Sequence, residues 1–452
     1  MARGKKKEKE LTPEEKLQQA LVPVEEQPYK IPENWCWLHG HAFLNQMETK
    51  RPSGSAFSYV DIDSIDNSRQ VVTAPKLINV DEAPSRASRA LHTGDTVFSM
   101  VRPYLKNIAF IDETLAESIG TTGFYVCSPK NNVNPKYNYY MMISPYVVDG
   151  LNAYMKGDNS PSIRKTDIEM FPYPIPPLPE QQRIVDRIES LFAKLDDAKE
   201  KAQAVVDGFE DRKAAILHMA FTGELTEEWR EDNGVSNDSW EEVPLSNVCK
   251  SIFDGDHMPP PKSEAGIPFL VISNVNSGYL SFDNTRFVPE HYYDCITDTR
   301  RPEKGDVLYT LVGSYGIPVV VDDDRPFCFQ RHMALLKPSI IDTYFLWYQL
   351  QSQLFFNKAT EIATGTAQLT VPIKGLRKLT IKLPISEEQK EIVSILDTLL
   401  LKERHIKELA GRVIDQIDIM KKSILARAFR GELGTNNLTD ESAEKLLKRI
   451  LI

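Results

Sequence analysis

A few short segments of this chain carry acidic, histidine or glycine residues of the kinds that catalytic sites use. Asp254-Gly255-Asp256-His257 offers carboxylate and imidazole groups, but a metal ion needs three or four convergent ligands and this segment resembles one tight turn. Gly94-Asp95 and Gly305-Asp306 each precede an apolar run, where the pair suits a turn better than an acid catalyst. The sequence also lacks a Gly-x-x-x-x-Gly-Lys phosphate loop, a Gly-x-Gly-x-x-Gly motif after a strand and an Asn/Asp-Pro-Pro-Tyr/Phe motif. We therefore expect no catalytic centre, no metal site and no bound cofactor.

Another group of side chains is suited to contacts with nucleic acid. Arg102, Tyr104 and Lys106 end an expected strand and open a loop. From there a guanidinium can reach the O6 and N7 atoms of guanine, and a phenol can contact a phosphate or a base. The same pattern also fits a surface arginine beside a packed tyrosine, so both interpretations stay open.

A second candidate set directly precedes an expected strand at 333–337. Gln330 and Arg331 are residue types that make bidentate contacts with base edges. His332 fits such a contact and equally fits a buried hydrogen-bonding role. We align Thr121 and Thr122 with Arg331 and His332 in the other half of the chain.

Two loops rich in glycine or hydroxyl residues complete the candidates. One contains Ser160 and leads to Arg164, and the other contains Thr366 and Gln368. Backbones of this kind fit closely against phosphates. An ordinary connecting loop has the same composition, so the alternative remains.

Two similar segments, domain 1 (residues 31–177) and domain 2 (residues 238–384), must position these residues. In both, a Gly-Asp turn leads into a β-branched and aromatic strand, and a second strand, an aromatic-rich helical stretch and a proline-punctuated strand follow. Strands mixed with a few helices, without the regular alternation of a Rossmann sheet, predict α/β domains. The second strands are expected near 123–127 and 333–337, and the helical stretches at 137–154 and 344–356.

After each domain comes a long helical segment, and the two segments are copies at a constant offset of 208 residues. Glu180-Gln181-Gln182 matches Glu388-Gln389-Lys390, and Ala220-Phe221-Thr222-Gly223 matches Ala428-Phe429-Arg430-Gly431. Apolar residues recur in both at intervals of four and three, the seam of a coiled coil. The seam residues are Ile184, Ile188, Leu191, Leu195, Ala198, Ala202, Val205 and Phe209 in the first copy, and Ile392, Leu396, Leu399, Ile406, Ala410, Val413, Ile417, Met420 and Ile424 in the second.

One charged residue interrupts each seam. These are Arg212 in the first copy and Glu403 in the second. If the helices lie antiparallel about a pseudo-two-fold axis, the two charges face each other, which would fix register and orientation. The alternative is that both side chains reach solvent independently.

The ends of the long helices also have sequence signals. Ser386 and Gln389 form a capping-box pattern at the start of the second helix, and Pro179 suits the first turn of the first. Gly223 and Gly431 are expected to end them. We thus expect the fold to comprise an extension (1–30), domain 1, a spacer helix and linker (178–237), domain 2, and a second spacer helix with a tail (385–452). Short helices are expected from Thr12 to about Leu21 and over 439–452.

Composition limits the class of protein. A chain of 452 residues exceeds one ordinary core, and its five scattered cysteines suggest reduced, mostly buried thiols. Residues 1–10 lack an apolar core, and no run is long enough to span a bilayer, so we expect a cytoplasmic protein. The formal net charge is −10 and no region is basic. Because phosphate contacts normally leave a basic footprint, either DNA is not the ligand or partners supply part of the positive surface.

The order of domain, helix, domain, helix resembles the DNA specificity subunit of type I restriction–modification systems. Leu178-Pro179-Glu180-Gln181-Gln182 at one helix start and Glu387-Glu388-Gln389 at the other carry the resemblance. Val101-Arg102-Pro103-Tyr104, Gly313-Ser314-Tyr315-Gly316 and Gly365-Thr366-Ala367-Gln368 are similar to segments of the family's target recognition domains. The resemblance covers nearly all of residues 31–433 and adds Ser314 and Tyr315 to the candidate DNA contacts.

The resemblance implies a bipartite reader of double-stranded DNA. Each recognition domain would read one half of a split target, and two antiparallel helices would set the distance between the halves. Two methylation subunits that carry S-adenosylmethionine, and restriction subunits with ATP-dependent activity, would assemble around a chain without catalysis or cofactor of its own. A stand-alone bivalent DNA-binding regulator is the alternative, and a pure coiled-coil scaffold would not need two loop-rich domains.

Overall fold

The computed structural model describes residues 12–255, 260–366 and 368–451. The chain divides into two compact units: unit 1 comprises Met1–Lys201 with Val413–Ile452, and unit 2 comprises Ala202–Arg412. Each unit holds one α/β domain together with part of both long helical segments. The expected fold class, two similar mixed α/β domains and two long helical segments, is confirmed.

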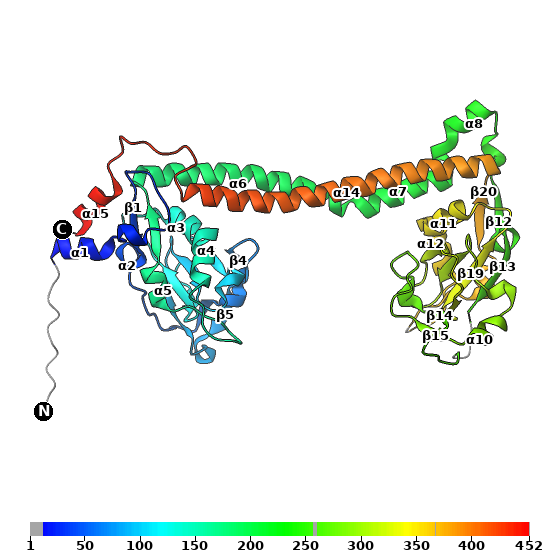
Figure 1. Ribbon diagram of the computed structural model, residues 1–452, viewed down its shortest axis with the longest axis horizontal. Helices are drawn as coiled ribbons and strands as arrows, with labels where there is room; N and C mark the ends of the chain where they lie inside the picture. Colours follow the sequence, from blue (N-terminus) through cyan, green and yellow to red (C-terminus); the bar gives the residue numbers. More distant parts are fainter. Residues whose placement is uncertain (1–11, 256–259, 367, 452) are drawn as a thin grey trace. The chain divides into compact units, whose positions relative to one another are not determined.

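Domain 1 is built from small sheets and short helices (Figure 1). Its strands are β1 (Cys36–His39), β2 (Ala56–Val60), β3 (Ile65–Asp66), β4 (Val71–Val72), β5 (Lys76–Asn79), β6 (Ala87–Ala90), β7 (Thr96–Ser99), β8 (Ile108–Phe110), β9 (Ile119–Thr121), β10 (Phe124–Cys127) and β11 (Pro172–Ile175). They form sheets of order β5-β2-β9-β6, β10-β7-β8, β1-β11 and β3-β4. Its helices are α2 (Gly40–Phe43), α3 (Pro135–Met142), α4 (Pro145–Asn152) and α5 (Lys165–Met170), with α1 (Pro13–Ala20) before the domain.

Domain 2 repeats much of this plan. Its strands are β12 (Glu241–Pro244), β13 (Cys249–Asp254), β14 (Ile267–Leu270), β15 (Arg286–Val288), β16 (Val307–Thr310), β17 (Pro318–Val320), β18 (Cys328–Phe329), β19 (Met333–Pro338) and β20 (Thr380–Leu383). They form sheets of order β13-β19-β16-β17, β15-β14-β18 and β12-β20. Its helices are α9 (Leu245–Val248), α10 (Glu290–Asp294), α11 (Thr343–Gln351), α12 (Gln353–Glu361) and α13 (Ile373–Leu376), with α8 (Glu227–Asn233) before it.

The aromatic-rich helical stretch of each domain is two helices rather than one. Ser144 separates α3 from α4, and Ser352 separates α11 from α12. Each serine hydroxyl accepts the backbone N–H three residues later, from Val147 at 3.3 Å and Phe355 at 3.2 Å. A serine N-cap starts a new helix at this point, and in domain 1 Pro145 directly after the serine occupies the first turn of α4.

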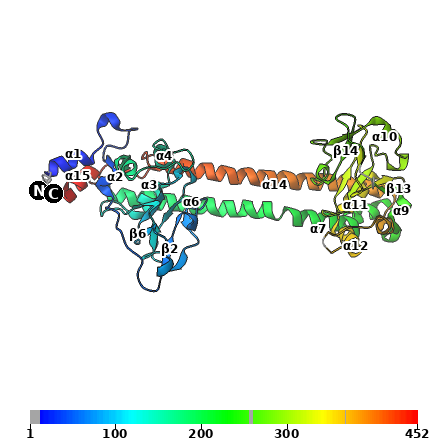
Figure 2. The same cartoon turned by 90° about the horizontal axis from the view of Figure 1, so that it is seen from below.

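The long helical segments are α6 (Leu178–Asp207) followed by α7 (Phe209–Thr222), and α14 (Ser386–Ala428). Within unit 1, α6 and the end of α14 lie side by side in both ribbon views (Figures 1 and 2). Gly223 and Gly431 follow the helix ends with φ of +92° and +74°, so both expected stops are confirmed. The interruption at Gly208 was not expected, because a single glycine does not by itself mark a break.

Ion pairs fix the direction of the helices inside each unit. Lys199 Nζ lies 2.7 Å from Asp418 in unit 1, and Lys421 pairs with Asp196, so higher numbers on one helix meet lower numbers on the other. In unit 2, Arg212 Nε donates to Glu403 Oε2 at 2.7 Å. The expected antiparallel arrangement and the pairing of the two charged interruptions are both confirmed.

Three of the nine predicted seam residues on α14 are wrong. Ile406, Val413 and Met420 are 44%, 46% and 47% exposed. Lys407 and Lys421 face the other helix instead, with their ammonium groups 4.3 Å and 4.9 Å from the ring centroids of Phe209 and Phe192. A lysine can lay its aliphatic stem along an apolar surface and place its charge over a ring, so the seam uses residues that hydropathy alone assigns to solvent.

Gly208, where the helix is interrupted, leaves space for the side chain of Arg212. The N–H of Gly208 still donates to the Ala204 carbonyl at 3.0 Å, and the N–H of Arg212 to the Gly208 carbonyl at 3.1 Å, so α6 and α7 continue into one another. Arg212 Nη2 also donates to the Val205 carbonyl at 2.9 Å. A β-carbon at position 208 would lie 2.8 Å from Arg212 Nη1, so glycine leaves the guanidinium the space that it needs.

We expect Arg212→Ala to lower the free energy of unfolding by about 1 kcal/mol, because a part-exposed ion pair contributes little and one backbone hydrogen bond is lost with it. Urea denaturation of the full chain measures the change. Arg187→Ala, an exposed arginine of α6, is the control and should change stability by less than about 0.5 kcal/mol. Equal effects of the two substitutions would contradict a role for Arg212 in the helix pair.

The duplicated Glu-Gln motif anchors each long helix to its own domain. Gln181 Nε2 donates to the carbonyls of Asn132 (3.1 Å) and Pro176 (3.0 Å), and its Oε1 accepts the N–H of Asn134 at 2.7 Å. Gln389 makes the equivalent bonds to Pro384 (2.9 Å) and Asp342 (2.8 Å). The predicted capping role of Gln389 is therefore wrong: its side chain bonds the domain and not the free N–H groups of its own helix.

The glutamate beside each glutamine is fully buried. Glu388 accepts hydrogen bonds from Arg230 Nη1 at 2.6 Å, Thr226 Oγ1 at 2.7 Å and Trp240 Nε1 at 3.0 Å. All three donors lie in the segment that follows α7. The start of α14 is thus held by the segment that follows α7.

Unit 1 has an equivalent cluster of hydrogen bonds around Glu180, and the chain's C-terminal segment contributes to it. Glu180 accepts from Trp35 Nε1 at 2.8 Å and from Asn436 Nδ2 at 2.9 Å, and burial raises the pKa of its carboxyl. α15 (Ala443–Leu451) lies beside α1 in both views (Figures 1 and 2), with Leu447 buried. The expected helix at Thr12 is confirmed, with a capping box between Thr12 and Glu15. The side chains of Ile450 and Leu451 lie outside the described residues.

Other expectations concern thiols, membranes and metals. Four cysteines are buried and Cys295 is exposed, all as free thiols. Over the described ranges, no helix is long and apolar enough to cross a membrane. No cluster of three or more potential metal ligands occurs among the described residues, and Asp256 and His257 lie outside them.

Candidate nucleic-acid interface

In domain 1, two candidate segments that are distant in sequence meet at the end of β7. Lys156 and Ser162 exchange two backbone hydrogen bonds of 3.0 Å and close a loop, and Val101 forms a bridge to Ser162. Arg102 Nη2 donates to the Asn159 carbonyl at 2.9 Å and lies 3.4 Å from Ser160 Oγ. Arg102 and Ser160, both exposed, therefore form one surface.

The backbone after β7 is constrained. Arg102 and Lys106 have φ of +48° and +57°, in the left-handed region that side chains other than glycine rarely adopt. The turn between them leaves Tyr104 and Leu105 46% and 40% exposed. Holding two such residues costs conformational energy, which is typical of functional loops. Tyr104 is thus available for an external contact.

A groove of about 710 Å³ adjoins this surface. Arg102, Thr121 and Ser160 line it together with Arg86, which the sequence did not single out. Arg86 is exposed, and its carbonyl accepts the N–H of Thr122 at 2.8 Å. An isolated arginine at the start of a short strand has no sequence signature, so only its neighbours in space reveal it.

Acidic side chains share the groove with these donors. Asp61, Asp63 and Asp66 also line it, and Asp61 forms an ion pair with Lys76. Carboxylates repel phosphates but accept hydrogen bonds from the amino groups of bases. The groove therefore suits base edges better than backbone phosphates.

The remaining candidates of domain 1 are less accessible or lie further away. Thr121 is buried, and its hydroxyl accepts the Gly123 N–H at 3.3 Å. Arg164 is exposed but stands at the start of α5, where its N–H donates to Asp167 Oδ2 at 2.6 Å. Arg164 does not line the groove.

Domain 2 builds the same pair of loops. Thr364 and Thr370 exchange two backbone hydrogen bonds of 2.8 Å, and Val312 forms a bridge to Thr370, as Val101 does to Ser162. A β-carbon on Gly313, which has φ of +73°, would lie 2.8 Å from Gln368 Nε2. The Gln368 amide thus lies over Gly313, and exposed Ser314 and Thr366 belong to the same two loops. Ala367 lies outside the described residues.

Tyr315 occupies a more enclosed place than Tyr104. Its ring stacks on Phe356 with a centroid distance of 5.4 Å, and its hydroxyl is 3.0 Å from Thr360 Oγ1. One face of the Tyr315 ring is therefore covered by Phe356 and its hydroxyl is already paired, so Tyr315 offers less to a ligand than Tyr104 does.

The expected alignment of Thr121 and Thr122 is wrong by one residue. The Met100 N–H donates to the Gly123 carbonyl at 2.9 Å, and the Leu311 N–H donates to the His332 carbonyl at 2.8 Å, so Gly123 corresponds to His332. Thr122 then corresponds to Arg331, and Thr121 to Gln330. The strand registers β7–β10 and β16–β19 give the same result.

Arg331 and His332 differ in their surroundings. Arg331 is exposed and its guanidinium is available, whereas His332 is half-buried. Burial, with a further contribution from the Arg331 charge, lowers the pKa of His332. The imidazole is therefore neutral at neutral pH, so one of its ring nitrogens donates a hydrogen bond and the other accepts one.

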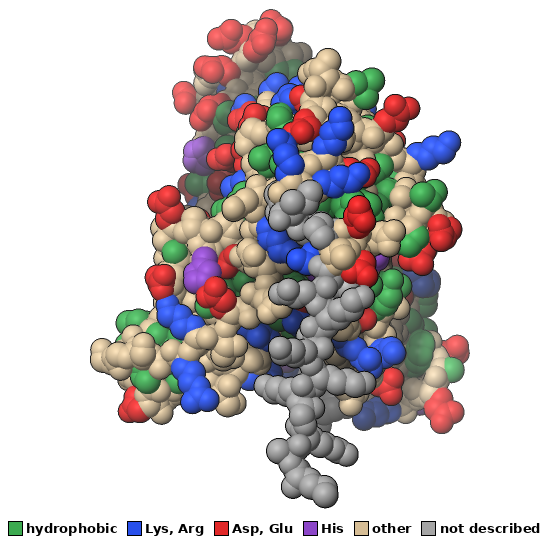
Figure 3. All heavy atoms as spheres, turned by 90° about the vertical axis from the view of Figure 1, so that its left-hand side faces the viewer, with side chains coloured by type: hydrophobic (Ala, Val, Ile, Leu, Met, Phe, Trp, Pro, Cys, Tyr) green, Lys and Arg blue, Asp and Glu red, His purple; other side chains and the backbone are tan. Residues whose placement is uncertain are grey.

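Charge is mixed on the face of unit 1 around α1 and α15. Figure 3 shows Lys and Arg side chains interspersed with Asp and Glu on its visible part. Such a surface gives no strong non-specific attraction for DNA.

Comparisons with known proteins agree with these features. The family model described as the type I restriction modification DNA specificity domain matches residues 47–206 and 237–410, most of the chain. The specificity subunit of the type I restriction enzyme EcoBI from Escherichia coli is 25% identical over 319 residues, which are 67% of this chain and 67% of that protein.

Solved structures give the same result. The HsdS subunit from Thermoanaerobacter tengcongensis has a TM-score of 0.63 and 26% identity, covering 91% of this chain and all (100%) of that one. A chain from a structure on complex assembly and conformational transition of the type I R-M system has a TM-score of 0.69, also at 26% identity, covering 90% of this chain and 100% of that one. With both α/β domains matched, the protein belongs to the family of type I restriction–modification DNA specificity subunits.

Proposed function

We propose that the chain directs a type I restriction–modification complex to a bipartite DNA target, one half read by each domain. The observation that carries this is the repeated pair of loops, which presents different side chains in the two domains. Arg102 and Ser160 stand where domain 2 has Gly313 and Gln368. Equivalent scaffolds with different hydrogen-bonding groups would read different bases, so the two half-sequences should differ.

The long helices would set the spacing between the half-sequences. A helix of 43 residues such as α14 is about 65 Å long, against ~34 Å for one turn of B-DNA. Antiparallel contacts within each unit give both helices a defined register. A ruler of this kind fixes distance without reading sequence.

The same helices offer surfaces for partner subunits. Ile406 and Leu409 in unit 2, and Val413 and Met420 in unit 1, are apolar and between 44% and 47% exposed. Apolar rows on a helix normally lie against another element. We assign them to docking of the methylation subunits, which would carry S-adenosylmethionine, while restriction subunits would supply ATP-dependent activity. The chain itself would contribute recognition and no catalysis.

A gel-shift titration over a range of salt concentrations, with and without the methylation subunits, tests this function. Because the chain is acidic overall and its charges are mixed, we expect specific binding only in the complex. Tight, sequence-specific binding by the chain alone would instead favour a stand-alone bivalent regulator. Absence of specific binding in both cases would contradict DNA recognition.

Arg331→Ala should weaken binding of the assembled complex at one base position. If the guanidinium makes a bidentate contact, the loss is about 1–3 kcal/mol at that position and specificity relaxes there. Competition with a panel of single-base variants of the target measures the effect. Lys304→Ala, which removes an exposed cation paired with Asp324, is the control. An equal loss on every sequence would make Arg331 a phosphate contact.

A further inference from the structure

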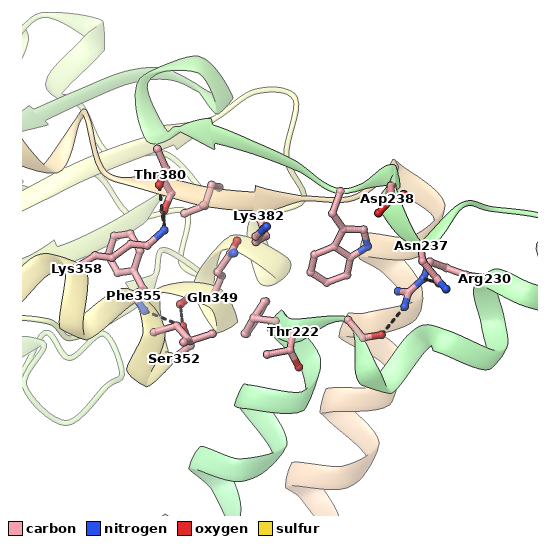
Figure 4. A pocket seen from close by; sticks show the side chains of 15 residues that line it. Thr222, Arg230, Asn237, Asp238, Gln349, Ser352, Phe355, Lys358, Thr380 and Lys382 are labelled. Carbon is pink, nitrogen blue, oxygen red and sulfur yellow. Dashed lines mark hydrogen bonds between the residues drawn. The ribbon is translucent and has the colours of Figure 1, made fainter.

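A pocket of about 550 Å³ in unit 2 lies where the end of α7 meets α11 and α12. Its lining includes Phe221, Thr222, Trp240, Gln349 and Leu354 (Figure 4). Gln349 is 5% exposed, and its Oε1 has no hydrogen-bond partner among the described residues. Figure 4 shows its side chain directed toward Lys382, among the lining residues. The pocket wall thus combines aromatic rings with polar groups, a lining that suits an amphipathic ring such as that of tyrosine.

Unit 1 contains the equivalent place, and there the chain itself fills it. The offset of 208 residues holds for the surrounding contacts: Ser144 Oγ donates to the Met141 carbonyl at 2.6 Å, and Ser352 Oγ to the Gln349 carbonyl at 2.6 Å. The counterparts of Phe221, Thr222 and Leu354 are therefore Phe429, Arg430 and Tyr146.

All three counterparts touch Tyr29, which comes from the extension before domain 1. The Tyr29 hydroxyl donates to the Phe429 carbonyl at 2.9 Å, its ring centroid is 5.3 Å from that of Tyr146, and the Arg430 guanidinium lies 5.4 Å from it. In unit 1, Tyr29 thus fills the space between the end of α14 and helix α4 of domain 1.

In unit 2, no tyrosine of the described residues lines the equivalent pocket. Trp35 and Trp240 are equivalent, since each donates its indole N–H to the buried glutamate. Tyr29 precedes Trp35 by six residues, and the residue six before Trp240 is Gly234. A β-carbon on Gly234 would meet no described atom within 4 Å. The segment before domain 2 therefore lacks the ring, and the pocket stays open.

We propose that this pocket receives a tyrosine from a segment of the methylation subunit, which does in unit 2 what Tyr29 does in unit 1. Its phenol would donate to the Phe221 carbonyl, as the Tyr29 phenol does to the carbonyl of the equivalent Phe429. A second copy of this chain is a poorer donor, because its own Tyr29 is already bonded to its Phe429. The proposal rests on the proposed function, since that function supplies the partner.

Photo-crosslinking in the complex of full-length chain and methylation subunits tests the proposal. The probe is p-benzoylphenylalanine at Leu354, which is 39% exposed and lines the pocket. We expect crosslinks to a tyrosine-containing segment of the methylation subunit. The same probe at the equivalent Tyr146 should react within the chain, near Tyr29. Crosslinks from position 354 to a second copy of this chain, or none to the methylation subunit in a complex that forms, would overturn the proposal.

A substitution that fills the pocket gives a second readout. Leu354→Trp should weaken association with the methylation subunit at least about tenfold, while Asn357→Trp, on the exposed side of the same helix, should leave it unchanged. Circular dichroism and melting of each variant chain check that it folds. Equal affinity of the two folded variants would overturn the proposal. If the unsubstituted chain forms no complex at all, the proposed function fails with it.

Discussion

Glu388→Ala is expected to destabilise unit 2 by about 3–5 kcal/mol, because it leaves the Arg230 guanidinium buried without its partner. The two side chains are 0% and 7% exposed, and the bonds from Thr226 and Trp240 are lost together with the ion pair. Hydrogen exchange in α11 and in α3 of the full chain separates the loss in unit 2 from the behaviour of unit 1.

Two further variants test the cause of that loss. Glu180→Ala breaks the equivalent cluster of unit 1, where the bonded donors are the neutral side chains of Trp35, Asn436 and Thr435, so a smaller cost of about 1–3 kcal/mol is expected there. The pair Glu388→Ala and Arg230→Met removes the unpaired charge and should recover part of the stability. No recovery would mean that the buried charge is not the source of the loss.

An insertion of four residues near Ala202 should lengthen the non-specific spacer of the DNA target. Four helical residues add about 6 Å, which is on the order of two base pairs at ~3.4 Å each. Both half-sequences should stay the same, because the loops of the two domains are untouched. The measurement is sequencing of methylated sites in cells that carry the variant with its partner subunits.

Two results would contradict this use of the helices. One is a spacer of unchanged length in an active complex, and the other is a change in either half-sequence. A four-residue insertion in the exposed loop at 53–55 of domain 1, which does not line the groove, serves as the control, since it adds the same length outside the helices.

The sequence was sufficient to predict features that depend on spacing along one helix. The duplication and the two charged interruptions predicted the antiparallel pairing of Arg212 with Glu403, because a pseudo-two-fold axis leaves one partner for each position. Helix ends at glycine and the capping box at Thr12 are likewise local signals. The glycine and capping signals each depend on a few neighbouring residues, whereas the pairing of Arg212 with Glu403 depends on the duplication, which gives the two helices one register.

Features that depend on contacts in three dimensions could not be predicted from the sequence. Lys407 and Lys421 enter the helix pair because aromatic rings lie opposite, and Gln389 faces the domain because Asp342 offers an N–H there. Arg86 joins the groove through a strand pairing that no local pattern reveals. The approach of Arg102 to Ser160 joins residues that are 58 positions apart, so only the fold brings them together.

Exchange of domain 1 is the most direct test of recognition by two independent domains. Residues 31–177 are replaced by the corresponding domain of another family member, and the methylated sites are sequenced in cells that also carry the partner subunits. The account predicts a split target in which one half-sequence is new, while the other half-sequence and the spacer are those of the unsubstituted chain. A target in which both half-sequences change, or neither does, would contradict it.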